Sequence, residues 1–170
     1  MALNIDKIFV EPIGLIYIRF ENPLNVPIQS QAAHEIPGII EIFPKYSEGL
    51  KDLEGFSYLI LIYYFHKIKE SKLQVKPFLD EIERGVYSTR APIRPNHLGI
   101  SLVKLNEIDN NMMKVQGIDI VDRTPLLDIK PFIPTFDIPR ATKDKIKIGW
   151  LTDRIHQLDH TLDDGRFYSK

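Results

Sequence analysis

Twelve prolines are distributed along this chain of 170 residues, and they restrict its possible folds more than any other feature. Proline fixes φ at about −65° and has no backbone N–H, so it breaks a helix when it stands in the middle of one. We therefore expect no long helix, and a fold built mainly from strands.

Short runs of β-branched and aromatic residues, bounded by Pro, Gly, Asn and Asp, predict the strands. In chain order they are expected at residues 8–18, 36–43, 56–65, 98–108, 112–121 and 126–133. The run 56–65 is almost entirely apolar, so we expect it to be buried on both faces. Asp109-Asn110-Asn111 predicts a tight hairpin, because Asn and Asp tolerate positive φ.

Helical patterns are short. Ser47–Leu53 is expected to form a short helix that begins at Ser47, and apolar residues at helical spacing predict a second from Gly149 to His160. The expected architecture is mainly β: an antiparallel β-barrel with short peripheral helices and a C-terminal helix. We expect one domain, with the barrel in residues 1–140 and a helical extension of it in residues 141–170.

Composition excludes several kinds of chemistry. The chain has no cysteine, which rules out disulfides, thiolate metal sites and cysteine nucleophiles. No apolar run approaches the roughly 20 residues that span a bilayer, and Met1–Lys7 lacks a signal-peptide pattern, so we expect a cytoplasmic protein without a membrane partner. Dinucleotide, P-loop, HExxH and GxSxG motifs are absent, and we expect no metal.

The net charge of −1 means that a nucleic acid would have to meet a local basic patch. Two groups of basic residues are candidates, although solvated surface lysines are the simpler interpretation of either one. They are Lys67, Lys69, Lys72 and Lys76, and Arg140, Lys143, Lys145 and Lys147.

The segment Gly85–Ser101 is the densest in functional groups. It holds two arginines and an asparagine, and Pro92 and Pro95 stiffen the path between Arg90 and Arg94. Guanidinium groups on a stiffened backbone suit planar anions such as carboxylates and phosphates. The segment therefore predicts a preformed polar site.

Two other stretches are similarly polar. In residues 117–132, strand alternation places Asp128 and Lys130 on one face, with Leu127 and Ile129 toward the core. A surface ion pair between Asp128 and Lys130 is the competing interpretation. His66-Lys67 follows the apolar run, at a strand end where barrels often place ligand contacts, although a lone histidine is more often structural.

Three motifs in order resemble one family. Residues 85–99 are similar to GVFATRSPxRPNPIG, residues 119–131 to LDxxDGTPxLDIKPY, and residues 39–56 to IEIFPEY…GLxxLEGFSHL. These patterns are those of the TsaA-like (TrmO) family of tRNA methyltransferases, and the match runs from about residue 13 to residue 134. The resemblance implies a homodimeric β-barrel that uses S-adenosyl-L-methionine to methylate the exocyclic amine of threonylcarbamoyladenosine beside the tRNA anticodon.

The resemblance also implies site residues. The cofactor contacts carried over by motif are Pro27, Ile28, Gln29, His66, Lys67, Arg90, Ile100, Asp122, Arg123, Thr124 and Pro125. Substrate contacts are expected at Arg94, Asn96 and Lys130, and candidates for the catalytic base are Asp128 and His66. Arg90 is expected to hold a carboxylate, of the cofactor or of the threonyl group.

The chain departs from the family pattern twice. Arg123 stands where the family has a glycine, and His97 stands where it has a proline. A barrel that binds RNA or a nucleotide without catalysis would explain these departures and stays open. A small-molecule methyltransferase with the same cofactor pocket is a second open alternative.

Overall fold

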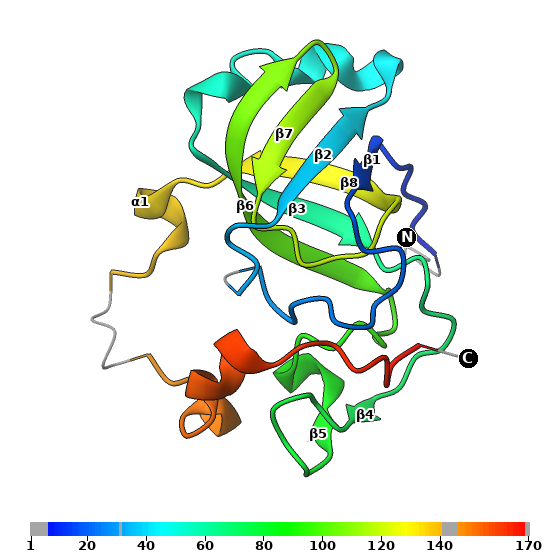
Figure 1. Ribbon diagram of the computed structural model, residues 1–170, viewed down its shortest axis with the longest axis vertical. Coiled ribbons are helices and arrows are strands. Elements are labelled where there is room, and N and C mark those ends of the chain that lie inside the picture. Colours follow the sequence, from blue (N-terminus) through cyan, green and yellow to red (C-terminus); the bar gives the residue numbers. More distant parts are fainter. Residues whose placement is uncertain (1–6, 31, 141–145, 169–170) are drawn as a thin grey trace, which may run out of the picture.

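Six antiparallel strands close into a barrel in the computed structural model of the protein (Figure 1), which describes residues 7–30, 32–140 and 146–168. Around the barrel the strands follow the order β1, β2, β7, β6, β3, β8. Their bounds are Gly14–Tyr17 (β1), Pro37–Ile42 (β2), Tyr58–Tyr64 (β3), Leu98–Asp109 (β6), Met112–Gln116 (β7) and Thr124–Pro131 (β8). The mainly β, barrel prediction is confirmed.

The barrel interior follows from the period-2 alternation of its strands. In β6 every second residue from Gly99 to Leu105 is buried, while Leu98, Ile100 and Leu102 face outward. Burial of each large aliphatic side chain contributes about 1.5–3 kcal/mol. The largest fully buried aliphatic side chains of this interior are Ile16, Ile40, Ile42, Leu59, Leu61, Met113, Ile118 and Leu126.

Two expectations about strands were wrong in detail. β3 is not buried on both faces, because a barrel strand has one inner face: Leu59 and Leu61 are buried, whereas Tyr58 is 44% exposed. In β8, Leu126 takes the core position expected of Leu127. Ile62 pairs with Asp128 and Tyr63 with Leu126, so Leu127 is the extra residue of a β-bulge that shifts the alternation.

The peripheral helices are short, and most are 3-10 turns. The predicted C-terminal helix is divided into η5 (Gly149–Leu151) and η6 (Ile155–His160). The helix expected from Ser47 begins earlier, at Pro44, because proline suits a first turn; the Ser47 hydroxyl donates to the carbonyl of Pro44 instead of capping. The other short elements are η1 (Pro44–Leu50), η2 (Leu53–Gly55), β4 (Gln74–Val75), β5 (Arg84–Gly85), η3 (Val86–Ser88) and α1 (Pro134–Asp137).

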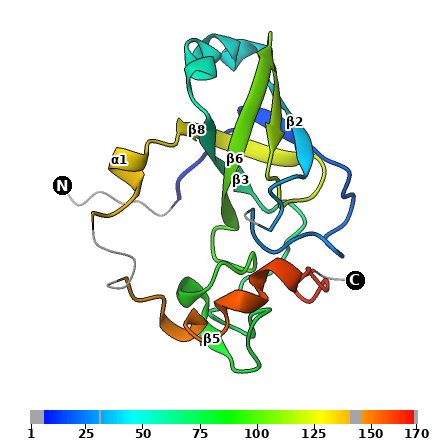
Figure 2. The ribbon, with the colours of Figure 1, turned by 60° about the vertical axis from the view of Figure 1, so that its left-hand side comes forward.

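A second apolar cluster lies outside the barrel, where the C-terminal segment passes beside the segment that links β3 to β6 (Figure 2). Phe167 packs there with Ile68, Val75 and Val86. The buried carboxylate of Asp80 holds the two segments together, since it accepts hydrogen bonds from Arg84 and forms an ion pair with Arg154 at 3.2 Å. The C-terminal segment is thus fixed below the barrel.

The predicted boundary between barrel and extension, between residues 140 and 141, adjoins residues 141–145, which lie outside the described residues, and it stays a prediction. No helix among the described residues is long and apolar enough to cross a membrane. Within the same residues, no group of three or more His, Cys, Asp or Glu side chains is arranged to hold a metal ion.

Candidate functional site

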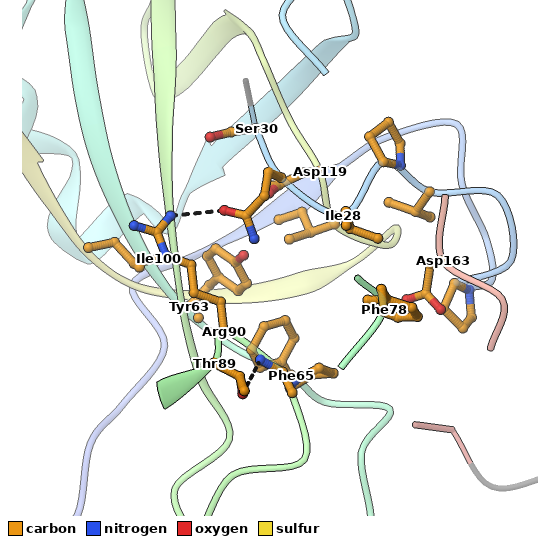
Figure 3. A pocket seen from close by; sticks show the side chains of 18 of the residues that line it. Ile28, Ser30, Tyr63, Phe65, Phe78, Thr89, Arg90, Ile100, Asp119 and Asp163 are labelled. Carbon is orange, nitrogen blue, oxygen red and sulfur yellow. Dashed lines mark hydrogen bonds between the residues drawn. The ribbon is translucent and has the colours of Figure 1, made fainter. Parts of the chain in front are cut away.

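A cavity of about 1600 Å³ opens between the barrel and the segments that cross its lower end (Figure 3). Its walls come from the loop between β1 and β2, the ends of β3 and β6, the segment after η3, and the C-terminal segment. Many of the predicted site residues line this cavity. They come from each of these segments except the C-terminal one, and one further residue lies at the start of β8. They are Pro27, Ile28, Gln29, His66, Lys67, Arg90, Arg94, Ile100 and Thr124.

The loop that carries Pro27, Ile28 and Gln29 is held by the C-terminal segment. Pro27 forms an isolated antiparallel bridge with Leu162, and Asp163 exchanges backbone hydrogen bonds of 2.8 Å with Asn25 and Val26. This pairing fixes an irregular loop as a short piece of sheet. The C-terminal segment also supplies cavity wall itself, through Trp150, Leu151, Ile155, Leu158, Asp163, Phe167 and Tyr168.

Arg90 projects into the cavity from a rigid turn. Thr89 Oγ1 donates to the carbonyl of Val86 and accepts from the amide of Ala91, which fixes the backbone on either side of Arg90. Arg90 Nη1 donates to Gln29 Oε1 at 2.9 Å. The guanidinium group keeps other N–H donors for a ligand, because this bond uses one of five.

His66 lies in the tight turn after β3, and its Nδ1 atom is buried without a hydrogen-bond partner among the described residues. Burial lowers the pKa of His66, and the adjacent Lys67 ammonium lowers it further. The imidazole is therefore neutral near pH 7 and keeps an unused polar atom. Lys67 itself donates to the carbonyl of Glu21.

Asp119 is a cavity residue that the sequence interpretation did not select. Its Oδ1 accepts a hydrogen bond from Ser101, whose hydroxyl lies 3.0 Å from that of Tyr63. Burial raises the pKa of Asp119 to about 6, against the opposing effects of the Ser101 hydrogen bond and the Arg90 charge. The Tyr63 ring fits because residue 99 is glycine: a Cβ there would lie 2.2 Å from a ring atom.

A signal for Asp119 existed in the sequence, since it opens the polar stretch 117–132 and the family motif. No such signal existed for Ser101 or Tyr63, because each stands in an apolar strand, where a single polar residue is expected from ordinary strand alternation. The pairing of β6 with β7 brings Ser101 to Asp119, and the pairing of β3 with β6 brings Tyr63 to Ser101.

Of the predicted cofactor contacts in the turn at residues 122–125, one lines the cavity and the other three do not. Thr124 lines the cavity and is 1% exposed, whereas Asp122, Arg123 and Pro125 do not line it. Asp122 Oδ1 instead accepts a hydrogen bond of 3.0 Å from the amide of Ile18, after β1. Arg123 has φ +57°, so it adopts the left-handed conformation that the family's glycine would take easily.

Two of the three expected substrate contacts, Asn96 and Lys130, and the base candidate Asp128 lie outside the cavity, whereas Arg94 lines it. Asp128 forms an ion pair of 2.8 Å with Lys130 and neither lines the cavity, as the competing interpretation of that stretch held. Asn96 is exposed and also outside the cavity, while Arg94 Nη1 donates to the carbonyls of Val86 and Thr89. Arg94 therefore braces the loop that presents Arg90.

The basic groups are mostly solvated. Lys76 pairs with Glu81, while Lys69, Lys72, Arg140 and Lys147 are exposed. Lys143 and Lys145 lie outside the described residues. The cavity itself combines apolar walls with guanidinium groups, carboxylates and the neutral imidazole of His66, which suits a ligand that has an aromatic ring and charges of both signs.

Comparison with known proteins identifies the fold's relatives. Residues 15–138 match the family model of the tRNA-methyltransferase O N-terminal domain, TrmO_N. The chain belongs to the TrmO family. The resemblance found in the sequence motifs is thereby confirmed, and the matched range agrees with the extent expected from them.

Relatives of this TrmO-family chain differ in length. It is 50% identical over 158 residues to a probable S-adenosyl-L-methionine-binding protein of Pyrococcus abyssi, covering 93% of this chain and 84% of the relative. It is 32% identical to a tRNA (adenine(37)-N6)-methyltransferase of Rattus norvegicus, of which it spans 36% while 86% of this chain is covered. A crystal structure of TrmO from Pseudomonas aeruginosa superposes with a TM-score of 0.67 at 32% identity, over 83% of this chain and 63% of that one.

Proposed function

We propose that this chain is an S-adenosylmethionine-dependent tRNA methyltransferase whose target is the exocyclic amine of threonylcarbamoyladenosine beside the anticodon. Membership of the TrmO family and the names of its relatives support S-adenosylmethionine and tRNA as the two ligands. The observation that carries the proposal is one cavity in which separate chain segments bring together Gln29, His66, Arg90, Ile100 and Thr124.

The cavity residues fit S-adenosylmethionine chemically. The cofactor has an aromatic purine ring with apolar faces, a charged amino acid part and, when bound, supplies a methyl group activated by a sulfonium centre. Ile28 and Ile100 offer apolar surface for the ring, and the unpartnered His66 Nδ1 offers a polar contact. Arg90 suits a carboxylate, because a guanidinium group binds one through two parallel hydrogen bonds.

Catalysis by this chain rests mainly on positioning. Cavity walls that hold two ligands in line, away from water, supply much of the rate of a displacement reaction. The amine proton of the target is acidified by the neighbouring carbonyl, so a modest base suffices. Of the two base candidates only His66 lines the cavity, and its lowered pKa keeps it neutral and able to accept that proton.

Replacement of Arg90 tests the proposal. We expect Arg90→Ala to abolish methylation of tRNA that carries threonylcarbamoyladenosine while the protein keeps its cooperative thermal transition. Arg19→Ala is the matched control, because Arg19 is an exposed arginine outside this cavity. Full activity of the Arg90 variant would contradict the assignment.

We also propose that the chain acts as a homodimer in the cytoplasm. The outer face of β6 exposes Leu98, Ile100 and Leu102, and Tyr58 of β3 continues this apolar stripe. These four residues also line the cavity, so a second copy that buries the stripe would close the cavity on that side. Light scattering should then find the Leu102→Asp variant to be a monomer. The control Ile39→Asp changes an exposed apolar position on β2 and should leave the dimer intact. A monomeric wild-type protein would contradict this proposal.

The alternative of a barrel that binds RNA without catalysis is favoured by the two departures at Arg123 and His97. Against it, Arg123 keeps the left-handed turn that a glycine would form. Calorimetry separates the two functions: micromolar binding of S-adenosylmethionine supports the enzyme, whereas tRNA binding without cofactor binding supports the alternative.

A further inference from the structure

The carboxylate of Asp119 has no cationic partner within the part of the chain that the structure describes. Ser101 donates a hydrogen bond to its Oδ1, and no lysine, arginine or histidine of that part forms an ion pair with it. Arg90 is close enough to act on it electrostatically, yet it bonds to Gln29 instead (Figure 3). Asp119 is partly buried and lines the cavity, and a partly buried carboxylate is stabilised by a nearby cation, so this arrangement suits a cation brought by a ligand.

The other carboxylates that line the cavity are less suited to this role. The Glu35 side chain is 88% exposed and lies 3.8 Å from His34, so water and a neighbour already solvate it. Asp163 Oδ1 accepts from the amide of Gly165 in the C-terminal segment. Among these cavity carboxylates, Asp119 is the one that lies beside Arg90 and is oriented by the hydroxyl group of Ser101.

Arg90 and Asp119 place one positive and one negative group next to each other on the cavity wall. An α-amino acid carries an ammonium group and a carboxylate on the same carbon, so its charges complement such a pair. We propose that Asp119 binds the α-ammonium group of the methionyl part of S-adenosylmethionine, with Arg90 at the α-carboxylate. Ser101, hydrogen-bonded to Tyr63, acts as a positioning residue for Asp119.

This inference rests on the proposed function for the identity of the ligand, but its test needs no tRNA. Two ligands separate the amino acid part from the nucleoside: S-adenosylhomocysteine has the ammonium group and no sulfonium, and methylthioadenosine has neither. Calorimetry of the full chain measures the affinity of both, and of S-adenosylmethionine, for wild type, Asp119→Asn and Asp128→Asn. The last is a matched control, because Asp128 lies outside the cavity.

We expect Asp119→Asn to weaken S-adenosylhomocysteine about 10- to 100-fold, as for loss of a charged hydrogen bond, and methylthioadenosine less than about 2-fold. Asp128→Asn should change neither. Loss of S-adenosylmethionine affinity without loss for S-adenosylhomocysteine would place the carboxylate at the sulfonium and overturn the proposal. Equal losses for S-adenosylhomocysteine and methylthioadenosine would overturn it too, as would no loss.

Two further comparisons separate a folding defect or a different cofactor from a failure of the role assigned to Asp119. If Asp119→Asn lacks a cooperative thermal transition, Asp119→Ser repeats the comparison with a smaller neutral side chain, and the same pattern is expected. Ser101→Ala should weaken S-adenosylhomocysteine only, and less than the Asp119 variants do. Failure of wild type to bind S-adenosylhomocysteine or S-adenosylmethionine would overturn the cofactor assignment itself, and the role of Asp119 with it.

Discussion

Arg90 Nη1 and Gln29 Oε1 form a hydrogen bond of 2.9 Å between residues 61 positions apart in the sequence. The bond joins the loop after β1 to the segment before β6, on the two sides of the cavity. Both residues were predicted as cofactor contacts, from two stretches that are distant in the sequence. Their contact shows that the fold makes one site of these stretches.

Removal of the amide should loosen this site. We expect Gln29→Ala to weaken S-adenosylhomocysteine binding about 2- to 12-fold, since Arg90 loses the partner that orients it. Calorimetry measures the change, with Gln74→Ala on β4 as the control outside the cavity. Unchanged affinity would show that Arg90 needs no orientation by Gln29.

Asp119 should make stability depend on pH. Its pKa is about 6 in the folded protein against 3.8 for the ordinary group, so the folded state binds the proton more tightly. Stability from the protonated carboxyl is present below about pH 4 and is lost as the pH rises through about 6. The Asp119→Asn variant does not lose this stability as the pH rises. The pKa of Asp163 is also raised to about 6, but Asp163 contributes equally to the pH dependence of wild type and variant.

We therefore expect Asp119→Asn to gain stability relative to wild type as the pH rises. The difference in unfolding free energy should shift by about 2 kcal/mol between about pH 4.5 and about pH 7.5 in favour of the variant. Urea titrations at the two pH values measure it. A difference that does not vary with pH would mean that the carboxylate is well solvated.

Arg123→Gly should stabilise the protein by about 1 kcal/mol, because a residue with a Cβ is strained at φ +57° and glycine is not. Urea titration measures the gain. Asn110→Gly, at φ +54° in the hairpin, should change stability by less than about 0.5 kcal/mol, since asparagine tolerates this region. Cofactor affinity should stay constant, because Arg123 does not line the cavity.

His97→Pro restores the family residue and should nevertheless destabilise this chain by about 3 kcal/mol or more. His97 has φ +48°, which proline cannot adopt, and its amide donates to the carbonyl of Arg94. Its ring also lies within hydrogen-bond distance of Tyr64 OH and the carbonyl of Glu70. Thermal unfolding compares it with His97→Asn, which tolerates the backbone and should lose about 1 kcal/mol; equal melting temperatures would contradict the strain argument.

Local patterns were enough to predict the barrel, because alternation and turn residues are properties of neighbouring positions. Asn110 takes the positive φ expected of the hairpin. The shifted alternation at Leu127 was not predictable, since the bulge depends on pairing with β3. The break between η5 and η6 was missed because Arg154 turns toward Asp80 and the carbonyl of Leu79, which are distant in sequence.

The site residues that could be predicted from the sequence are those that the resemblance to the family identified. Gln29, His66 and Arg90 were named from the sequence and line one cavity. Asp119 was passed over in favour of Asp128, because nothing in the order of residues tells which acid faces inward. The wall formed by the C-terminal segment depends on long-range packing against residues 25–27, and the family match ends before it, at residue 138.

The central claim is methyl transfer to a modified adenosine of tRNA, and mass spectrometry of nucleosides tests it most directly. Purified protein is incubated with S-adenosylmethionine and tRNA that carries threonylcarbamoyladenosine, and the tRNA is then digested. We expect the threonylcarbamoyladenosine peak to shift by the mass of one methyl group with wild type and to stay unshifted with Arg90→Ala. An unshifted peak with wild-type protein that binds both ligands would contradict the account.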